Sequence, residues 1–124
     1  MLEMERETLE RFKKKVLNKL EDRVHAIVIY GSLARGTYTK DSDIDILVIG
    51  ENKADWERVS RIAYEIDYEN GFRTFITTMF LTKNEFEQRL KAGDPFIHNV
   101  LREGVVLYDT GVYEGFRKSM LEAR

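Results

Sequence analysis

The fold is decided by residues 27–49, IVIYGSLARGTYTKDSDIDILVI, which read as two apolar runs joined by a polar loop. The first run ends at Gly31-Ser32, and ten residues later the second run begins with Asp43-Ile44-Asp45. Short runs that are rich in β-branched residues and bounded by turn signals are typical of buried strands. The stretch therefore predicts two strands, and because consecutive strands usually lie side by side, we expect them to be neighbours in one sheet.

On either side of this stretch, apolar residues recur at steps of three and four, which is the pattern of helices with one buried face. The expected helices are 3–22, a short one at 33–35, 53–67, 83–91, 95–102 and 111–123, and the expected strands are 24–30, 44–49, 73–81 and 105–108. Ser32 is expected to cap the short helix, and Thr82 with Glu85 has the spacing of a capping box. This order predicts an α+β fold in which a small sheet is packed with helices, in a single domain over residues 1–124.

The charge and composition of the chain exclude several classes of protein. Lys and Arg number 20 against 22 Asp and Glu, so the net charge is -2, whereas a protein that grips nucleic acid through its phosphates is usually basic. There is no cysteine and no apolar run of about 20 residues, which argues against disulfides, thiolate metal sites and a membrane span. We expect a cytoplasmic protein without a secretory signal and without strong direct binding to nucleic acid.

Asp43 and Asp45 are the first candidate site residues. Residues two apart on a strand point to the same face, so the two carboxylates would lie close together at the start of the second strand. Like charges at that distance need a cation, and Mg²⁺ is the natural one because it accepts two carboxylates and completes its shell with water and substrate phosphates.

Gly31 and Ser32 supply the second half of the predicted site. A glycine lets a phosphate approach the backbone, and a serine at the start of a helix offers a hydroxyl and free N–H groups to an anion. Arg35 and Lys40 flank this turn and are candidates for phosphate contact, although solvated loop charges are the alternative interpretation. A polyphosphate and its metal in one cleft is an arrangement suited to phosphoryl or nucleotidyl transfer. A structural Mg²⁺ or Ca²⁺ site without a nucleotide is the competing hypothesis.

The sequence YGSLARGTYTKDSDIDILV closely resembles the signature of the nucleotidyltransferase superfamily with the DNA polymerase β fold, and most of all its minimal nucleotidyltransferases. The signature, Gly-Ser followed after ten residues by Asp-x-Asp, is matched by Gly31, Ser32, Asp43 and Asp45, and Ser42 also falls where these proteins often have a serine. The resemblance implies a polymerase β palm-like fold with a small mixed sheet. It also implies that Asp43 and Asp45 are catalytic residues binding one or two Mg²⁺ ions, and that Gly31, Ser32, Arg35, Lys40 and Ser42 face the nucleotide.

The resemblance also suggests a role and a partner. Minimal nucleotidyltransferases are commonly paired with a helical HEPN-type toxin and act as its antitoxin by transferring AMP from ATP onto it. The resemblance therefore implies a Mg²⁺-dependent enzyme with ATP as substrate and a HEPN-type protein as acceptor. The nucleotide, the acceptor group and the oligomeric state, including a homo-oligomer, stay open.

In one respect the chain departs from the family pattern. Active members carry a third carboxylate on the next core strand, but residues 73–81, RTFITTMFL, contain no acid. Asp67, expected at a helix end, and Glu69, expected in a turn, are the nearest candidates. The alternative function is a catalytically weak or inactive module that neutralises its partner by binding.

Overall fold

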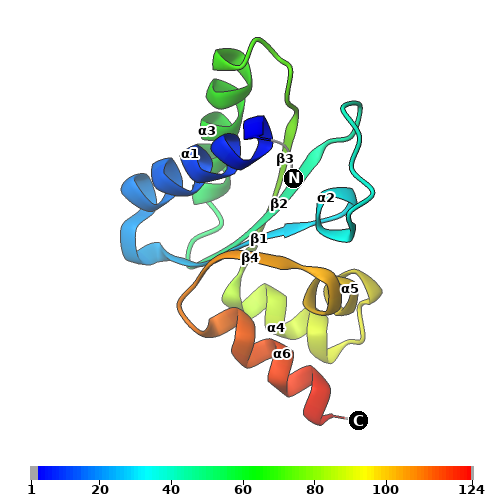
Figure 1. The fold of residues 1–124 in the computed structure, drawn as a ribbon. Helices are drawn as coiled ribbons and strands as arrows, with labels where there is room; N and C mark the ends of the chain where they lie inside the picture. The colour runs from blue at the N-terminus through cyan, green and yellow to red at the C-terminus, as the bar shows by residue number, and fades with distance from the viewer. Residues whose placement is uncertain (1–2, 124) are drawn as a thin grey trace.

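Strands form one mixed sheet in the order β3-β2-β1-β4 in the computed structural model, which describes residues 3–123 (Figure 1). The strands are β1 (Val24–Tyr30), β2 (Ile44–Gly50), β3 (Ile76–Thr82) and β4 (Val105–Asp109). β1 is antiparallel to both β2 and β4, and β2 is parallel to β3. The mixed sheet and the adjacency of the two motif strands are confirmed, and β4 lies at the sheet edge as expected from its length.

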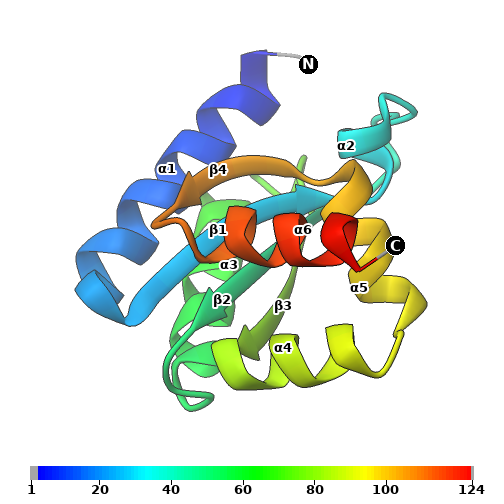
Figure 2. The same ribbon diagram turned by 90° about the horizontal axis from the view of Figure 1, so that it is seen from below.

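Helices cover both faces of the sheet. They are α1 (Glu3–Leu20), α2 (Ser32–Arg35), α3 (Asp55–Glu69), α4 (Lys83–Lys91), α5 (Pro95–Glu103) and α6 (Val112–Glu122), with a 3₁₀ turn at Glu21–Arg23. α1 and α3 lie on one face (Figure 1), and α4, α5 and α6 lie on the other, in front of the strands in Figure 2. Within residues 3–123 no helix has the length and apolar character that a membrane crossing requires.

The central strands are apolar throughout because each of their two faces is buried. Successive side chains of a strand point to opposite faces, so Ile27 and Ile29 of β1 pack against α1 and α3, while Ala26 and Val28 pack against α4, α5 and α6. β2 follows the same alternation, and Leu47 lies on the α4–α6 face. A strand covered on both sides needs no polar positions, which explains the continuous apolar runs in the sequence.

Two expected boundaries are confirmed and three are wrong. The capping box at the start of α4 is present: Glu85 N donates to Thr82 Oγ1 at 3.1 Å and Thr82 N donates to Glu85 Oε1 at 2.9 Å. Gly36 ends α2 in the left-handed conformation. However, Ser32 is the first residue of α2 and Gly31 is its N-cap, because the chain turns at Gly31 with a positive φ.

The expected strand at 73–81 begins three residues later than predicted, at Ile76. The reason is a carboxylate: Asp67 accepts hydrogen bonds from Thr74 Oγ1 at 2.8 Å and from Ile76 N at 2.9 Å, which holds the preceding segment against the end of α3. α3 itself continues through Glu69, so the prediction of a turn at Glu69 is wrong.

Candidate active site

The candidate site is built on a row of three residues that crosses the sheet. Tyr30 of β1 pairs with Asp45 of β2, and Asp45 pairs with Thr77 of β3. The hydroxyl of Thr77 donates to Asp45 Oδ1 in a short hydrogen bond. By strand alternation the three side chains lie on the face that α4, α5 and α6 cover, and Tyr30 packs edge-to-face on Phe96 of α5 with ring centroids 5.3 Å apart.

Gly31 brings the backbone into contact with Asp45. A Cβ built on Gly31 would lie 2.2 Å from Asp45 Oδ2 and 3.1 Å from its Cγ, so no larger residue fits without displacing the carboxylate. The backbone at Gly31 has φ 75° and ψ -152°, a region that is essentially reserved for glycine. The glycine of the motif is therefore required both for the turn and for the close approach.

The carboxylate of Asp45 influences the neighbouring phenol. Burial and, secondly, the negative charge of Asp45 raise the pKa of Tyr30 above its ordinary value, so the phenol stays protonated at neutral pH. Asp43 lies just before β2 and is exposed. Ile44, between the two aspartates, donates its N–H to the carbonyl of Phe75 at 2.8 Å, which extends the parallel pairing of β2 with the segment before β3.

The other predicted site residues lie on α2 and the loop after it. Ser32 starts α2 directly beside Gly31, and its carbonyl accepts from Thr37 N at 2.9 Å. Ser42 closes the loop through its hydroxyl, which accepts from Thr39 N at 3.0 Å. Lys40 is exposed in this loop, and Arg35 lies 3.8 Å from Glu103 of α5. The fold thus brings Gly31, Ser32 and Asp45 together, whereas Arg35 and Ser42 already have partners within the chain.

Neither candidate for the third carboxylate belongs to this row. Asp67 is buried, 6% exposed, on the helix that covers the opposite face. Its burial raises the pKa, the hydrogen bonds from Ile76 N and Thr74 lower it, and the charge of Asp43 raises it, which leaves the pKa above its ordinary value. Glu69 pairs with Arg11 and lies 3.7 Å from Lys15 of α1. Over residues 3–123 no group of three or more acidic or histidine side chains is placed to hold a metal ion.

The residue that faces Asp45 from the next core strand is therefore Thr77. The sequence shows that this strand contains no acid but does not single out Thr77, because the parallel register of β2 and β3 is not encoded in either strand alone. The strand contains several threonines, and its alternating pattern does not indicate which of them faces Asp45.

The donors available at the site fit a hard cation. Asp43 is exposed, and Asp45 makes its side-chain hydrogen bond through Oδ1 with Thr77, so both residues present carboxylate oxygen, the ligand type that Mg²⁺ prefers. Two protein carboxylates suffice for Mg²⁺ when water and substrate phosphates complete its shell. We infer that this pair could hold Mg²⁺ only together with such additional ligands.

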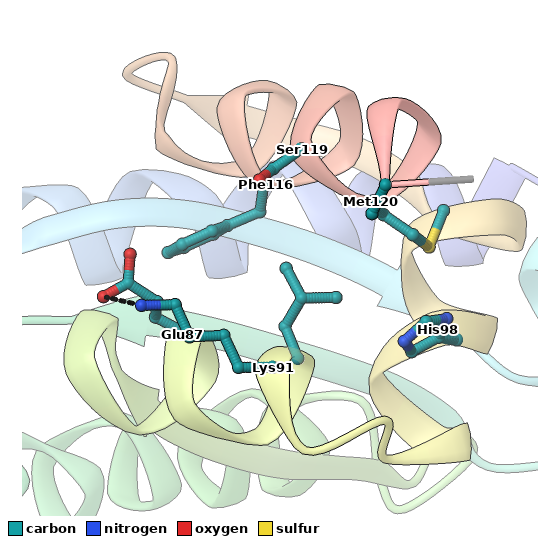
Figure 3. Close-up of a pocket in the computed structure, with 8 residues that line it drawn as sticks. Glu87, Lys91, His98, Phe116, Ser119 and Met120 are labelled. Carbon is teal, nitrogen blue, oxygen red and sulfur yellow. Dashed lines mark ion pairs between the residues drawn. The ribbon is translucent and has the colours of Figure 1, made fainter.

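A hollow of about 210 Å³ lies between α4, α5 and α6, away from the candidate site residues (Figure 3). Phe116 and Met120 of α6 and His98 of α5 line it, and Glu87 and Lys91 form an ion pair at its rim. None of the predicted site residues lines this hollow, so it is not part of the candidate site.

Comparison with known proteins points to one family. Residues 13–111 match the family model described as polymerase beta, nucleotidyltransferase. Two candidate protein adenylyltransferases of Methanocaldococcus jannaschii are each 32% identical to the chain. The first aligns over 84% of this chain and 98% of its own length, and the second over 92% and 76%.

The fold is shared with solved toxin–antitoxin complexes. A toxin–antitoxin structure with AMP-PNP has a TM-score of 0.57 at 21% identity, covering 92% of this chain and 85% of that one. A complex of a tri-AMPylated Shewanella oneidensis HEPN toxin with its MNT antitoxin has a TM-score of 0.55 at 18% identity, covering 95% and 84%. These likenesses confirm the expected polymerase β-type fold.

Proposed function

Because the chain belongs to the polymerase beta nucleotidyltransferase family, we propose that it transfers AMP from ATP to a hydroxyl group of a protein partner in a Mg²⁺-dependent reaction. The observation that carries the proposal is the contact of the Gly31 backbone with the Asp45 carboxylate. That contact places the turn that would bind phosphates directly beside the acid that would bind their metal.

Each residue of the site has a separate task in this reaction. Asp43 and Asp45 would hold Mg²⁺, which, when bound, neutralises phosphate charge and stabilises the charge that develops on the transferred group. Gly31 and Ser32 would bind the outer phosphates through backbone N–H groups and the serine hydroxyl. The acceptor hydroxyl loses its proton to solvent and its oxygen bonds to the α-phosphorus. The bond from that phosphorus to the bridging oxygen breaks, and its electron pair leaves with pyrophosphate.

The nature of the acceptor is proposed from the relatives. The two Methanocaldococcus jannaschii relatives are named as protein adenylyltransferases, and one structural neighbour is bound to an AMPylated HEPN toxin. We propose that this chain is likewise the antitoxin of a helical HEPN-type protein. The proposal that the transferred nucleotide is AMP is supported by the same comparison.

The test is transfer of label from ATP carrying a labelled α-phosphate to the protein encoded by the adjacent gene. We expect label on the partner with Mg²⁺ and none with EDTA, and none with the Asp43→Ala/Asp45→Ala double variant. Wild-type protein that binds Mg²⁺ tightly without any effect of nucleotide, and transfers no label, would contradict the proposal and favour a structural metal site.

A second candidate function rests on Thr77. A threonine in the position that faces Asp45 offers no carboxylate to a second metal or to the attacking hydroxyl. A chain with this substitution could neutralise a toxin by contact alone. In that case the partner forms a stable complex and is neutralised equally by wild type and by the Asp43→Ala/Asp45→Ala variant.

Replacing Thr77 by aspartate distinguishes a weakened enzyme from a contact antitoxin. We expect Thr77→Asp to increase the rate of AMP transfer by about tenfold or more, since a positioned acid or base typically contributes about 10²–10⁴-fold. Without Mg²⁺ the new charge repels Asp45 and lowers the melting temperature, and Mg²⁺ restores it. Rate assays and thermal melts with and without Mg²⁺ measure both effects, with Thr77→Asn as the uncharged control. Equal rates for the two variants would contradict this role for position 77.

A further inference from the structure

Four aromatic side chains form an exposed patch beside the candidate site. Tyr64 and Tyr68 lie on α3, Phe72 follows in the α3–β3 connection, and Phe75 precedes β3; they are 41–66% exposed. Phe72 links the others, with ring centroids 5.8 Å from Tyr64, 6.0 Å from Tyr68 and 6.4 Å from Phe75. A cluster of exposed aromatic rings is uncommon on a folded surface and marks an interaction site more often than a single exposed residue does.

The patch adjoins the two aspartates. The carbonyl of Phe75 accepts the N–H of Ile44, the residue between Asp43 and Asp45. Phe75 directly precedes Ile76, the first residue of β3. The α3–β3 connection and the loop between α2 and β2 both reach the same end of the sheet (Figure 1). The patch therefore begins next to the start of β2, at the end of the sheet that carries Asp43 and Asp45.

The backbone of Phe72 gives a second indication that the patch serves binding. Phe72 has φ 57°, which places a bulky side chain in the left-handed region that residues other than glycine rarely adopt. The conformation is held by the bond from its N–H to the carbonyl of Asp67 at 2.8 Å. The exposed ring of Phe72 does not stabilise the core. Backbone strain at such a residue is typical of functional sites.

The order of the strands determines which reactant would meet this patch. β2 lies between β1, which ends in Gly31-Ser32, and β3. If the outer phosphates occupy the Gly31-Ser32 side, the attacking oxygen must enter from the opposite side of the transferred phosphorus, because the attacking and leaving oxygens lie roughly in line. That opposite side is the β3 edge, where the patch begins.

The charges around the patch favour a protein over a nucleic acid. A surface hollow of about 440 Å³ runs along α3 between Tyr64 and Tyr68, and Glu65 and Glu69 form its polar lining. Glu69 is paired with Arg11 and Lys15, whereas within the described part of the chain Glu65 makes no ion pair, so the uncompensated negative charge of the hollow is that of Glu65. Carboxylates repel nucleic-acid phosphates, whereas they complement a protein surface with lysines and arginines at its rim.

We propose that Tyr64, Tyr68, Phe72 and Phe75 form the docking surface for the protein that accepts the nucleotidyl group, and that this protein presents an apolar centre bordered by basic residues. The inference rests on the proposed function and adds the surface that recognises the acceptor. Exposed tyrosines are frequent anchors of protein interfaces, and each well-packed anchor has a large effect on affinity.

The test compares two double variants at exposed positions. Tyr64→Ala/Tyr68→Ala removes the two patch residues that lie on α3, and Val105→Ala/Val106→Ala removes two side chains that are each 44% exposed on β4, at the edge of the sheet opposite β3. Complex formation with the adjacent-gene protein is measured by titration, and AMP transfer by label. We expect the tyrosine variant to weaken binding at least about tenfold and to raise KM for the protein, with KM for ATP unchanged, and the valine variant to behave as wild type.

The binding assay separates this inference from the proposed function. Weakened binding of the tyrosine variant supports the docking surface even if wild type transfers no label, in which case only the proposed function fails. Unchanged binding by the tyrosine variant overturns the docking surface whether or not transfer occurs. A single-stranded oligonucleotide that binds wild type and is lost in the tyrosine variant, or a wild-type dimer that this variant dissociates, would also overturn it by giving the patch a different occupant.

Discussion

Asp45→Asn is expected to reduce AMP transfer by about 10³-fold, which corresponds to roughly 4 kcal/mol of transition-state stabilisation. The amide has nearly the shape of the carboxylate, and its oxygen can still accept the hydrogen bond of Thr77. What the substitution removes is the negative charge that would bind Mg²⁺. The loss should therefore be in the rate of transfer, measured as kcat/KM with labelled ATP, and not in the fold.

Asp41→Asn is the control, because Asp41 is an exposed aspartate in the loop that leads into β2 and lies outside the Asp43/Asp45 pair. We expect it to transfer AMP at the wild-type rate. Thermal melts add an independent measurement: Mg²⁺ with a non-hydrolysable ATP analogue should raise the melting temperature of wild type and of Asp41→Asn but not of Asp45→Asn. Wild-type activity in Asp45→Asn would remove the basis for assigning this carboxylate to the metal.

The elements that the sequence predicted well are those determined by local interactions. The α4 helix was expected at 83–91 and is found there, because its capping box, Thr82 with Glu85, is complete within four residues. β1 was expected at 24–30 and is found there, because the apolar run ends at Gly31, where the backbone turns with a positive φ. In both cases residues close in the sequence determine where the element begins or ends.

The elements that were predicted less well depend on contacts between distant residues. The start of β3 is set by Asp67, which bonds to Thr74 and Ile76 across seven and nine residues. Asn70, just after α3, donates to Thr8 of α1 at 3.0 Å, so the connection is also anchored to the first helix. Periodicity carries no information on such bonds, so the sequence alone predicts strand for the aromatic residues before β3.

The candidate site shows the same division. Gly31, Ser32, Asp43 and Asp45 could be selected from their spacing because the chemistry of the motif is local to two consecutive strands. Their contact, with the Gly31 backbone against the Asp45 carboxylate, requires the antiparallel register of β1 and β2. Thr77 faces Asp45 because β2 and β3 pair in a parallel register. The two strands are connected through α3, so this register is apparent only in the assembled sheet.

Gly31→Ala is expected to be the most damaging single-methyl change in the motif. The added Cβ would lie 2.2 Å from Asp45 Oδ2, and the residue would keep a backbone conformation that alanine strongly disfavours. Backbone strain of this kind costs about 1–3 kcal/mol, so we expect a melting temperature lower by about 5–10 °C together with loss of AMP transfer. Gly36→Ala is the control, since Gly36 also has a positive φ of 77° but a Cβ there would meet no atom within 4 Å.

A double-mutant cycle separates the clash from the strain. In an Asp45→Ala background the carboxylate is gone, and of the three atoms nearest to the Cβ added by Gly31→Ala just the Cβ of residue 45 remains, at 3.4 Å. The strain remains while the clash with the carboxylate disappears, so the free energy of unfolding lost through Gly31→Ala should shrink by about 0.5–3 kcal/mol, the range of coupling energies for residues in contact. Chemical denaturation of the four proteins of the cycle measures this coupling. Strictly additive losses would mean that Gly31 and Asp45 do not touch, and the phosphate turn and the metal-binding acid would then belong to separate parts of the surface.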